Sequence, residues 1–199
     1  MCSQPIDDKY NNKCNNIHSL LFRAYTDNYI LQSIDSIKSK LPQEATDTTH
    51  RMVFVLAHIC ELVKSDLALT IWKVFYDNGN DANTVKSLNR YLFATYKYKY
   101  KIIETDNIKK IRPTINDART GFIAHNLMDD TGRVLQTSDL FNALEDIRSI
   151  YNDMCIKDYD GRVEPLSNAE LLRMIFTEKG GFDFPIMQVL ESFENEERD

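Results

Sequence analysis

The apolar residues of this chain recur at helical spacing over long segments, and this pattern constrains the fold more than any other feature. The clearest stripe follows Asp47-Thr48-Thr49, which offer N-caps, and ends at Asn78-Gly79, a common helix stop. Its members are Met52, Leu56, Cys60, Val63, Leu67, Ile71 and Phe75. They lie three or four residues apart, so they share one face of a helix about 40 Å long.

Further helices are predicted on both sides of this one. Residues 17–41 carry a first apolar stripe, which Pro42 ends, and the later stripes cover residues 84–96, 114–126 and 138–154. Only six Gly and five Pro among 199 residues leave little material for a turn-rich β architecture. We therefore expect an all-α fold, an up-and-down helical bundle whose neighbouring helices are antiparallel.

The two ends of the chain lack the regular pattern of its middle. Residues 1–15 show no periodicity, and we expect a flexible arm there. Residues 16–160 should form the bundle, because the chain is long enough for one sizeable core. Residues 161–199 are expected to form a short C-terminal helical appendage, which opens with a capping box at residues 167–170 and ends in an acidic tail.

Composition argues against several classes of protein. The four cysteines form no Cys-x-x-Cys pair, which favours reduced thiols over a zinc or redox site. No apolar run is long enough to span a bilayer and no secretory pattern is present, so we expect a cytoplasmic protein without a membrane segment. A net charge of −6 disfavours binding of nucleic acid by bulk electrostatics. Any contact with RNA should therefore be local.

Arg119 and His125 are the strongest candidates for chemistry. Arginine stays charged and binds phosphate through two hydrogen bonds, whereas histidine gains or loses a proton near neutral pH. Two positions six residues apart on a straight helix diverge by about 120°, so one helix does not bring these side chains together. A twofold axis could place Arg119 of one protomer near His125 of its partner. Gly121, which lies between them, could instead mark a kink.

The segment 119–126 resembles the Arg-x(4–6)-His signature of the HEPN superfamily (higher eukaryotes and prokaryotes nucleotide-binding), and in particular its U-type abortive-infection branch. A second stretch, residues 66–77 followed by residues 87–92, is similar to another block of that branch and lies at the expected separation. The resemblance covers roughly residues 17–157. It implies a HEPN-like bundle that acts as a homodimer.

The resemblance also implies a metal-independent endoribonuclease of a phage-defence or toxin-antitoxin system. The 2′-hydroxyl of RNA would attack the adjacent phosphate and leave a 2′,3′-cyclic phosphate. His125 would serve as general acid or base, Arg119 would stabilise the phosphoryl oxygens, and Thr120 and Asn126 would support them. No cofactor is expected, whereas an antitoxin or regulatory partner is possible.

This chain departs from the family pattern directly after the arginine. Thr120 and Gly121 stand where the family often has a strongly polar residue, and the tyrosine that follows the histidine in some branches is absent. The alternative function is therefore a non-catalytic helical module that binds RNA or a protein and keeps the fold. A bundle enzyme with two metal ions is a third possibility, for which the sequence gives little support.

A basic stretch with interleaved tyrosines precedes the motif. Its cations are Lys97, Lys99, Lys101, Lys109, Lys110 and Arg112. Together with Tyr96, Tyr98 and Tyr100 they could hold a single RNA strand by phosphate contacts and base stacking. The alternative is a solvated flank with half-buried tyrosines. The period of two over residues 96–101 suits an extended segment as well as a helix end.

The remaining candidates have structural explanations. His58 and Glu61 lie three residues apart on the predicted second helix, but a metal site in a bundle needs further carboxylates from facing helices. Asp129 and Asp130 suit a turn, and Trp72 suits the core or a dimer interface. We therefore expect no metal site.

Overall fold

The computed structural model describes residues 8–40, 47–79, 82–120 and 136–154. These residues form five α-helices and one turn of π-helix, and they contain no strand. The elements are α1 (Asp8–Lys40), α2 (Asp47–Ile71), the π-helix η1 (Trp72–Tyr76), α3 (Val85–Tyr96), α4 (Asp106–Thr120) and α5 (Thr137–Met154). The prediction of an all-α helical bundle is confirmed.

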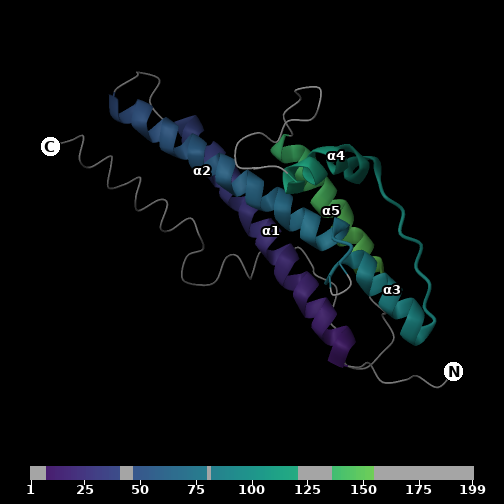
Figure 1. Ribbon diagram of the computed structural model, residues 1–199. Coiled ribbons are helices and arrows are strands. Elements are labelled where there is room, and N and C mark those ends of the chain that lie inside the picture. Colours follow the sequence, from purple (N-terminus) through teal and green to yellow (C-terminus); the bar gives the residue numbers. More distant parts are fainter. Residues whose placement is uncertain (1–7, 41–46, 80–81, 121–135, 155–199) are drawn as a thin grey trace.

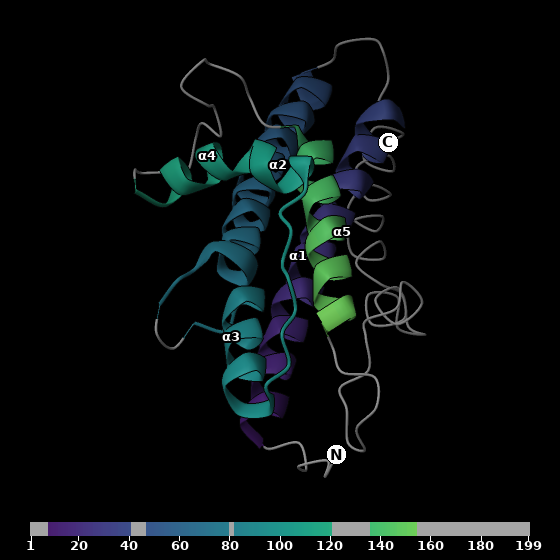
Figure 2. The ribbon, with the colours of Figure 1, turned by 90° about the vertical axis from the view of Figure 1, so that its right-hand side faces the viewer.

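The α1–α2 hairpin is the spine of the bundle. The two long helices run antiparallel and make the most extensive contact between elements (Figure 1). Seen from the side, α2, α3 and α5 run in one direction, α1 runs in the other, and α4 lies across α2 (Figure 2). The chain returns from α3 to α4 through residues 97–105, which form no helix. Thus α3 continues the direction of α2, and the predicted alternation of direction holds for the α1–α2 hairpin.

The apolar side chains of the described residues form two separate clusters. The larger one joins all five helices, with the side chains of Ile17, Leu88 and Tyr151 fully buried in it. The smaller one lies between the outer halves of α1 and α2 and contains Ile34 and Leu56. Figure 1 shows these outer halves extending beyond α3, α4 and α5. The outer hairpin therefore has only a two-helix core of its own.

Local signals in the sequence explain the limits of α3. The Ser87 backbone N–H donates to the Thr84 hydroxyl at 3.0 Å, and the Thr84 N–H donates to the Ser87 hydroxyl at 3.1 Å. These two bonds form a capping box, which satisfies N–H groups that a helix start leaves open. The helix ends where Lys97 adopts a left-handed conformation with φ of 58°. The start predicted near Thr84 is confirmed.

Two predicted boundaries are wrong. Helix α1 begins at Asp8, so residues 8–15 are not a flexible arm, and Tyr10 and Cys14 are buried in the core. The asparagines around them conceal their helical spacing in the sequence. Helix α4 begins at Asp106 and contains Pro113, instead of starting after it. Proline inside a helix costs about 3 kcal/mol, and the α4 residues that are completely buried offset this cost, namely Ile108, Ile111 and Ile115.

Two other expectations concern the ends of the bundle and membranes. The predicted appendage over residues 161–199 lies outside the described residues. None of the described helices has the length and apolar character needed to cross a bilayer.

Candidate functional site

The arginine of the predicted catalytic pair lies at the end of α4. Arg119 belongs to the last turn of this helix and Thr120 is its final residue, while His125 and Asn126 lie outside the described residues. In Figure 2, the first part of α4 lies across α2 and its later part projects beyond it. The backbone that carries Arg119 is therefore at the periphery of the bundle, where a second protomer or an RNA strand could approach it.

The first half of α4 is held firmly against the rest of the bundle. The Tyr76 hydroxyl donates to the Ile108 carbonyl at 2.6 Å. Asp146 of α5 accepts hydrogen bonds from the Thr105 hydroxyl at 2.6 Å and from the Asn107 side-chain amide at 2.9 Å. The hydroxyl of Thr105 also accepts from the Ile108 N–H at 3.3 Å, in the first turn of the helix. These contacts fix the direction in which α4 carries Arg119 outward.

The predicted RNA-binding cations on α4 already face carboxylates. Lys110 Nζ lies 2.7 Å from Asp139 Oδ1, and Arg112 Nη1 lies 3.2 Å from Glu104 Oε2. Lys109 Nζ lies 3.5 Å from an oxygen of Asp106 on the same helix. A phosphate would have to compete with these carboxylates, so the three cations are weakened as RNA ligands.

The three lysines of the extended segment are more available. Lys97, Lys99 and Lys101 are exposed, and they form no ion pair with any residue that the structure describes. Lys97 Nζ donates to the Ala94 carbonyl at 3.1 Å. Because this acceptor is a neutral backbone oxygen, the bond does not neutralise the charge of the lysine. Of the six predicted cations, these three are therefore the better phosphate ligands.

The interleaved tyrosines hold the extended segment against the bundle. Tyr98 and Tyr100 are half-buried and pack against the main core. The Tyr98 N–H donates to the Leu92 carbonyl at 3.3 Å, and the Asn89 side chain donates to the Tyr100 carbonyl at 3.0 Å. The period of two therefore places tyrosines inward and lysines outward, which is the structural alternative to a stacking surface for bases.

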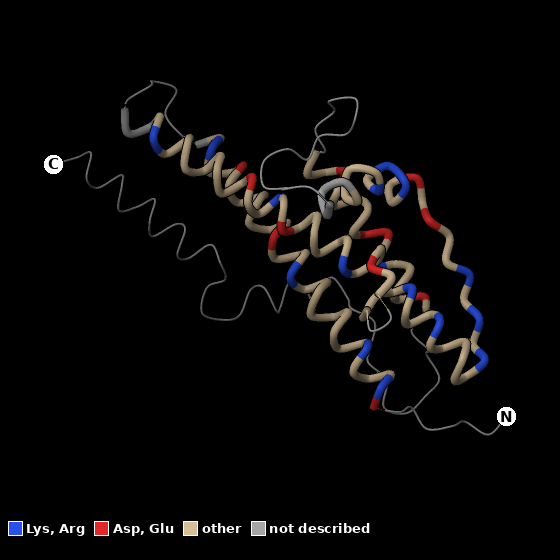
Figure 3. Tube along the Cα trace, viewed as in Figure 1, with Lys and Arg blue, Asp and Glu red and all other residues tan. Residues whose placement is uncertain are grey.

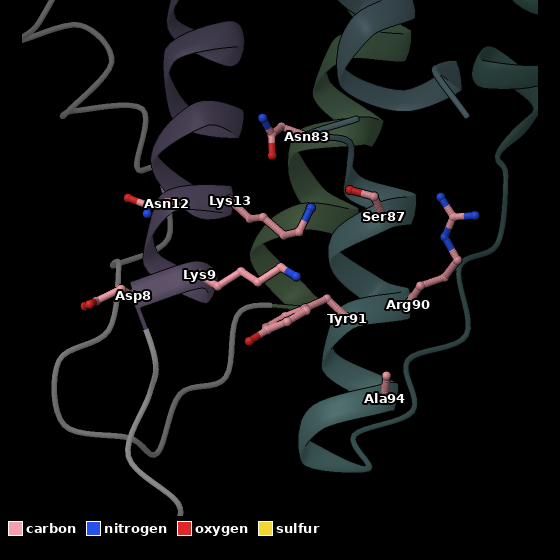
Figure 4. Close-up of a pocket in the computed structure, with 9 residues that line it drawn as sticks. All are labelled: Asp8, Lys9, Asn12, Lys13, Asn83, Ser87, Arg90, Tyr91 and Ala94. Carbon is pink, nitrogen blue, oxygen red and sulfur yellow. The ribbon is translucent and has the colours of Figure 1, made fainter. Parts of the chain in front are cut away.

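A pocket of about 710 Å³ lies between the first turns of α1 and most of the length of α3 (Figure 4). Lys9 and Lys13 extend from α1 towards α3, and Tyr91 extends from α3 towards α1. Lys9 Nζ lies 5.5 Å from the centre of the Tyr91 ring, within range of a cation-π contact. Arg90 adds a third cation, and Asp8 is the only acidic residue among those that line the pocket in the described structure.

This pocket belongs to a basic end of the bundle. Figure 3 shows basic residues on the first turns of α1, along α3 and on the extended segment, which meet at this end. Lys9, Lys13 and Arg90 are not among the candidates predicted from the sequence, because the two lysines lie in the segment expected to be a flexible arm and Arg90, on α3, meets them only in the folded chain. The helical spacing of Tyr10, Cys14 and Ile17 is the signal that could have placed the two lysines on a helix.

The first half of α2 presents an unusual apolar surface. Its large exposed hydrophobic residues are Val53, Phe54, Val55, Ile59 and Leu62. Phe54 is 76% exposed and Val55 is 54% exposed. The run of five apolar residues from Met52 to Leu56 covers every side of the helix. A helix that is apolar on all sides is normally buried in the assembled protein. We call the five exposed residues, Val53, Phe54, Val55, Ile59 and Leu62, the α2 apolar face.

Two carboxylates, Asp27 and Asp66, lie close together between α1 and α2, and of the two only Asp27 is buried. Arg23 donates to both oxygens of Asp66, from Nε at 2.8 Å and from Nη2 at 2.6 Å. Asp27 lies beside this ion pair, is 8% exposed, and has an Oδ2 atom without a hydrogen-bond partner in the described structure. Burial, together with the negative charge of Asp66, raises the pKa of the Asp27 carboxyl to about 7.

This raised pKa predicts a stability that falls as the pH rises. Between about pH 4 and pH 7 the folded protein keeps a proton on Asp27 that the unfolded chain has lost, so the free energy of unfolding decreases through this window. We expect Asp27→Asn to stabilise the protein at pH 8 by about 1–3 kcal/mol and to flatten the pH dependence. Urea unfolding at several pH values measures both effects. The exposed Asp35→Asn variant is the control, and an Asp27→Asn protein as pH-sensitive as wild type contradicts the prediction.

The other candidate groups from the sequence do not come together. His58 and Glu61 are both exposed on α2, and the described residues contain no cluster of three or more His, Cys, Asp or Glu side chains. Trp72 is half-buried and packs against the main core. Asp129 and Asp130 lie outside the described residues.

Comparison with protein families, with curated proteins and with solved structures finds no match to this chain. The case for a function therefore depends on the motif in the sequence and on the surfaces described above.

Proposed function

We propose that this protein is a metal-independent endoribonuclease of a phage-defence or toxin-antitoxin system, in which Arg119 and His125 act together at a homodimer interface. The observation that carries the proposal is the Arg-x5-His motif, which resembles that of the HEPN superfamily and begins in the last turn of α4. An antitoxin or regulatory partner would restrain such an activity in the cell.

The two side chains supply what cleavage of RNA by its own 2′-hydroxyl requires. His125 takes the proton of the 2′-hydroxyl, or returns a proton to the departing 5′-oxygen, at a pH near its own pKa. Arg119 binds the phosphoryl oxygens and stabilises the charge that accumulates on them in the transition state. The 2′-oxygen bonds to phosphorus while the bond to the 5′-oxygen breaks, so the products are a 2′,3′-cyclic phosphate and a 5′-hydroxyl. Thr120 and Asn126 support the pair.

The outer hairpin of α1 and α2 supports a homodimer. It has a small core of its own, and the α2 apolar face remains exposed beside it. Two such hairpins related by a twofold axis would complete a four-helix bundle, in which each hairpin covers the apolar face of the other. The second protomer is therefore the occupant that we propose for this face. A dimer also provides the second copy of α4 that brings Arg119 to a partner's His125.

The net charge of −6 does not disfavour RNA binding by the bundle, because the excess of acidic residues lies near the C-terminus. Of the 30 acidic and 24 basic residues, 11 acidic and 5 basic ones lie in residues 155–199, which leaves 19 of each in residues 1–154. The bundle is thus formally neutral, and the exposed lysines at positions 97, 99 and 101 give it a local positive surface. Such a surface suits a local contact with an RNA strand.

Cleavage of RNA in the presence of EDTA tests the proposed activity. We expect the purified protein to cut mixed cellular RNA and to leave 2′,3′-cyclic phosphate ends, which phosphatase treatment and end-labelling identify. Cleavage that disappears with the chelator contradicts a metal-independent reaction. Binding without any cleavage favours the second candidate, a non-catalytic RNA-binding module, which the lysine surface supports as well as it supports the nuclease.

A further inference from the structure

We infer that the pocket between α1 and α3 binds a backbone phosphate of single-stranded RNA, and that the strand continues across α3 to the lysines of the extended segment. The choice of RNA as the ligand takes the proposed function as its premise. The site itself is independent of Arg119 and His125, since it lies on other helices and at the basic end of the bundle.

The composition of the pocket favours an anion. Three cations line it, Lys9 and Lys13 from α1 and Arg90 from α3, against the single carboxylate of Asp8. Lys9 and Arg90 are exposed, and neither forms an ion pair with a residue that the structure describes. The first turn of α1 borders the same pocket, and its partial positive charge adds to theirs. A phosphate in the pocket would therefore gain Lys9 without displacing a carboxylate, and Arg90, which extends from α3 towards the extended segment (Figure 4), is available to a further phosphate of the same strand.

The pocket is continuous with the lysines of the extended segment. Ala94 lines the pocket, and its carbonyl oxygen accepts a hydrogen bond from Lys97 Nζ at 3.1 Å. Figure 4 shows α1 on one side of α3 and the extended segment on the other, with Arg90 on the part of α3 between them. Lys99 and Lys101 point outward from that segment, because the alternating tyrosines point inward. The cations thus follow a path across α3.

The shape of this path favours a strand over a small ligand. A mononucleotide presents its charges at one point, whereas the cations here are distributed over α1, α3 and the extended segment. The phosphates of a single strand are spaced along its backbone, so several cations can each meet one. Tyr91 could stack against a base beside the phosphate that Lys9 binds.

Charge reversal in the pocket tests the inference separately from cleavage. Binding of a fluorescent single-stranded RNA is measured by anisotropy at several salt concentrations, with every protein carrying His125→Ala so that the RNA stays intact. We expect Lys9→Glu and Arg90→Glu each to weaken binding about fivefold or more, and to reduce the salt slope by roughly 0.7. The matched control is Lys73→Glu, which reverses an exposed lysine on η1 and should change affinity less than twofold.

The outcomes distinguish the pocket from the nuclease. If the wild-type protein cleaves RNA but Lys9→Glu and Arg90→Glu bind as Lys73→Glu does, the pocket is not the RNA site and the proposed function stands. If both variants lose affinity while the wild-type protein cleaves nothing, the pocket stands and the nuclease does not. Adenosine monophosphate that competes as well as a short oligonucleotide would overturn the assignment of a strand. Melting temperatures of Lys9→Glu, Arg90→Glu and Lys73→Glu that equal the parent's show that these substitutions leave the fold intact.

Discussion

The variants His125→Ala and Arg119→Ala should each cleave RNA about 10²- to 10⁴-fold more slowly than the wild-type protein in EDTA. Loss of His125 removes the group that moves protons at the 2′- and 5′-oxygens. Loss of Arg119 removes the charge that stabilises the phosphoryl oxygens in the transition state. Arg119→Lys keeps the charge but loses the planar fork, so we expect an activity between those of Arg119→Ala and the wild type. Initial rates on a labelled RNA of fixed sequence measure all three.

A matched histidine provides the control for this experiment. His50 is exposed in the first turn of α2, and His50→Ala should cleave RNA at the wild-type rate. Circular dichroism shows whether each variant keeps its helices. Arg119→Ala and His125→Ala proteins that cleave as fast as His50→Ala would remove both residues from the mechanism.

The second large effect concerns the dimer. We expect Phe54→Glu to weaken self-association at least about 100-fold, because the twofold axis buries two new carboxylates in an apolar interface. Phe54 is 76% exposed in the single subunit, so the substitution should cost the fold little. RNA cleavage should fall with the dimer, since each proposed site needs both protomers. Sedimentation at several protein concentrations measures the association.

Phe93→Glu is the matched control, since Phe93 is 54% exposed on α3 and lies outside the α2 apolar face. It should leave self-association unchanged. The competing occupant of the face is the rest of the same chain, residues 155–199. In that case the wild-type protein would sediment as a monomer, and Phe54→Glu would lower the melting temperature sharply. A monomeric wild-type protein would contradict the proposed dimer, whereas the lower melting temperature alone would not, because loss of a dimer also lowers it.

The helices could be predicted from the sequence because most of them carry their own signals. The capping box at Thr84 and Ser87 fixes the start of α3, and the stripe over residues 138–154 corresponds to α5 within one residue. The start of α1 was harder to predict, since the asparagines around Tyr10 and Cys14 obscure the helical spacing of these two residues with Ile17. The start of α4 was predicted wrongly for a different reason. Burial of the apolar side chains of α4 outweighs the free-energy cost of Pro113 inside the helix, and this burial is a property of the fold.

The same distinction applies to the candidate site. Its local features could be predicted from the sequence, whereas the contacts that form only in the fold could not. The alternation of lysine and tyrosine over residues 96–101 left an extended segment and a helix end open, and the structure has an extended segment with the tyrosines inward. The ion pair of Lys110 with Asp139 joins residues 29 positions apart, so spacing alone did not reveal it. The pocket is also tertiary, because the whole of α2 separates α1 from α3 in the sequence and the two helices meet only in the folded chain.

Mixing two inactive variants tests whether the protomers share one site. Arg119→Ala and His125→Ala proteins, each inactive alone, are combined in equal amounts under conditions that exchange subunits. If Arg119 of one protomer works with His125 of its partner, each mixed dimer holds one intact site, half of the dimers are mixed, and about a quarter of the wild-type activity returns. If both residues serve the same protomer, every site in the mixture is defective and the activity stays at the level of the separate variants. That second result would contradict a site shared across the twofold axis.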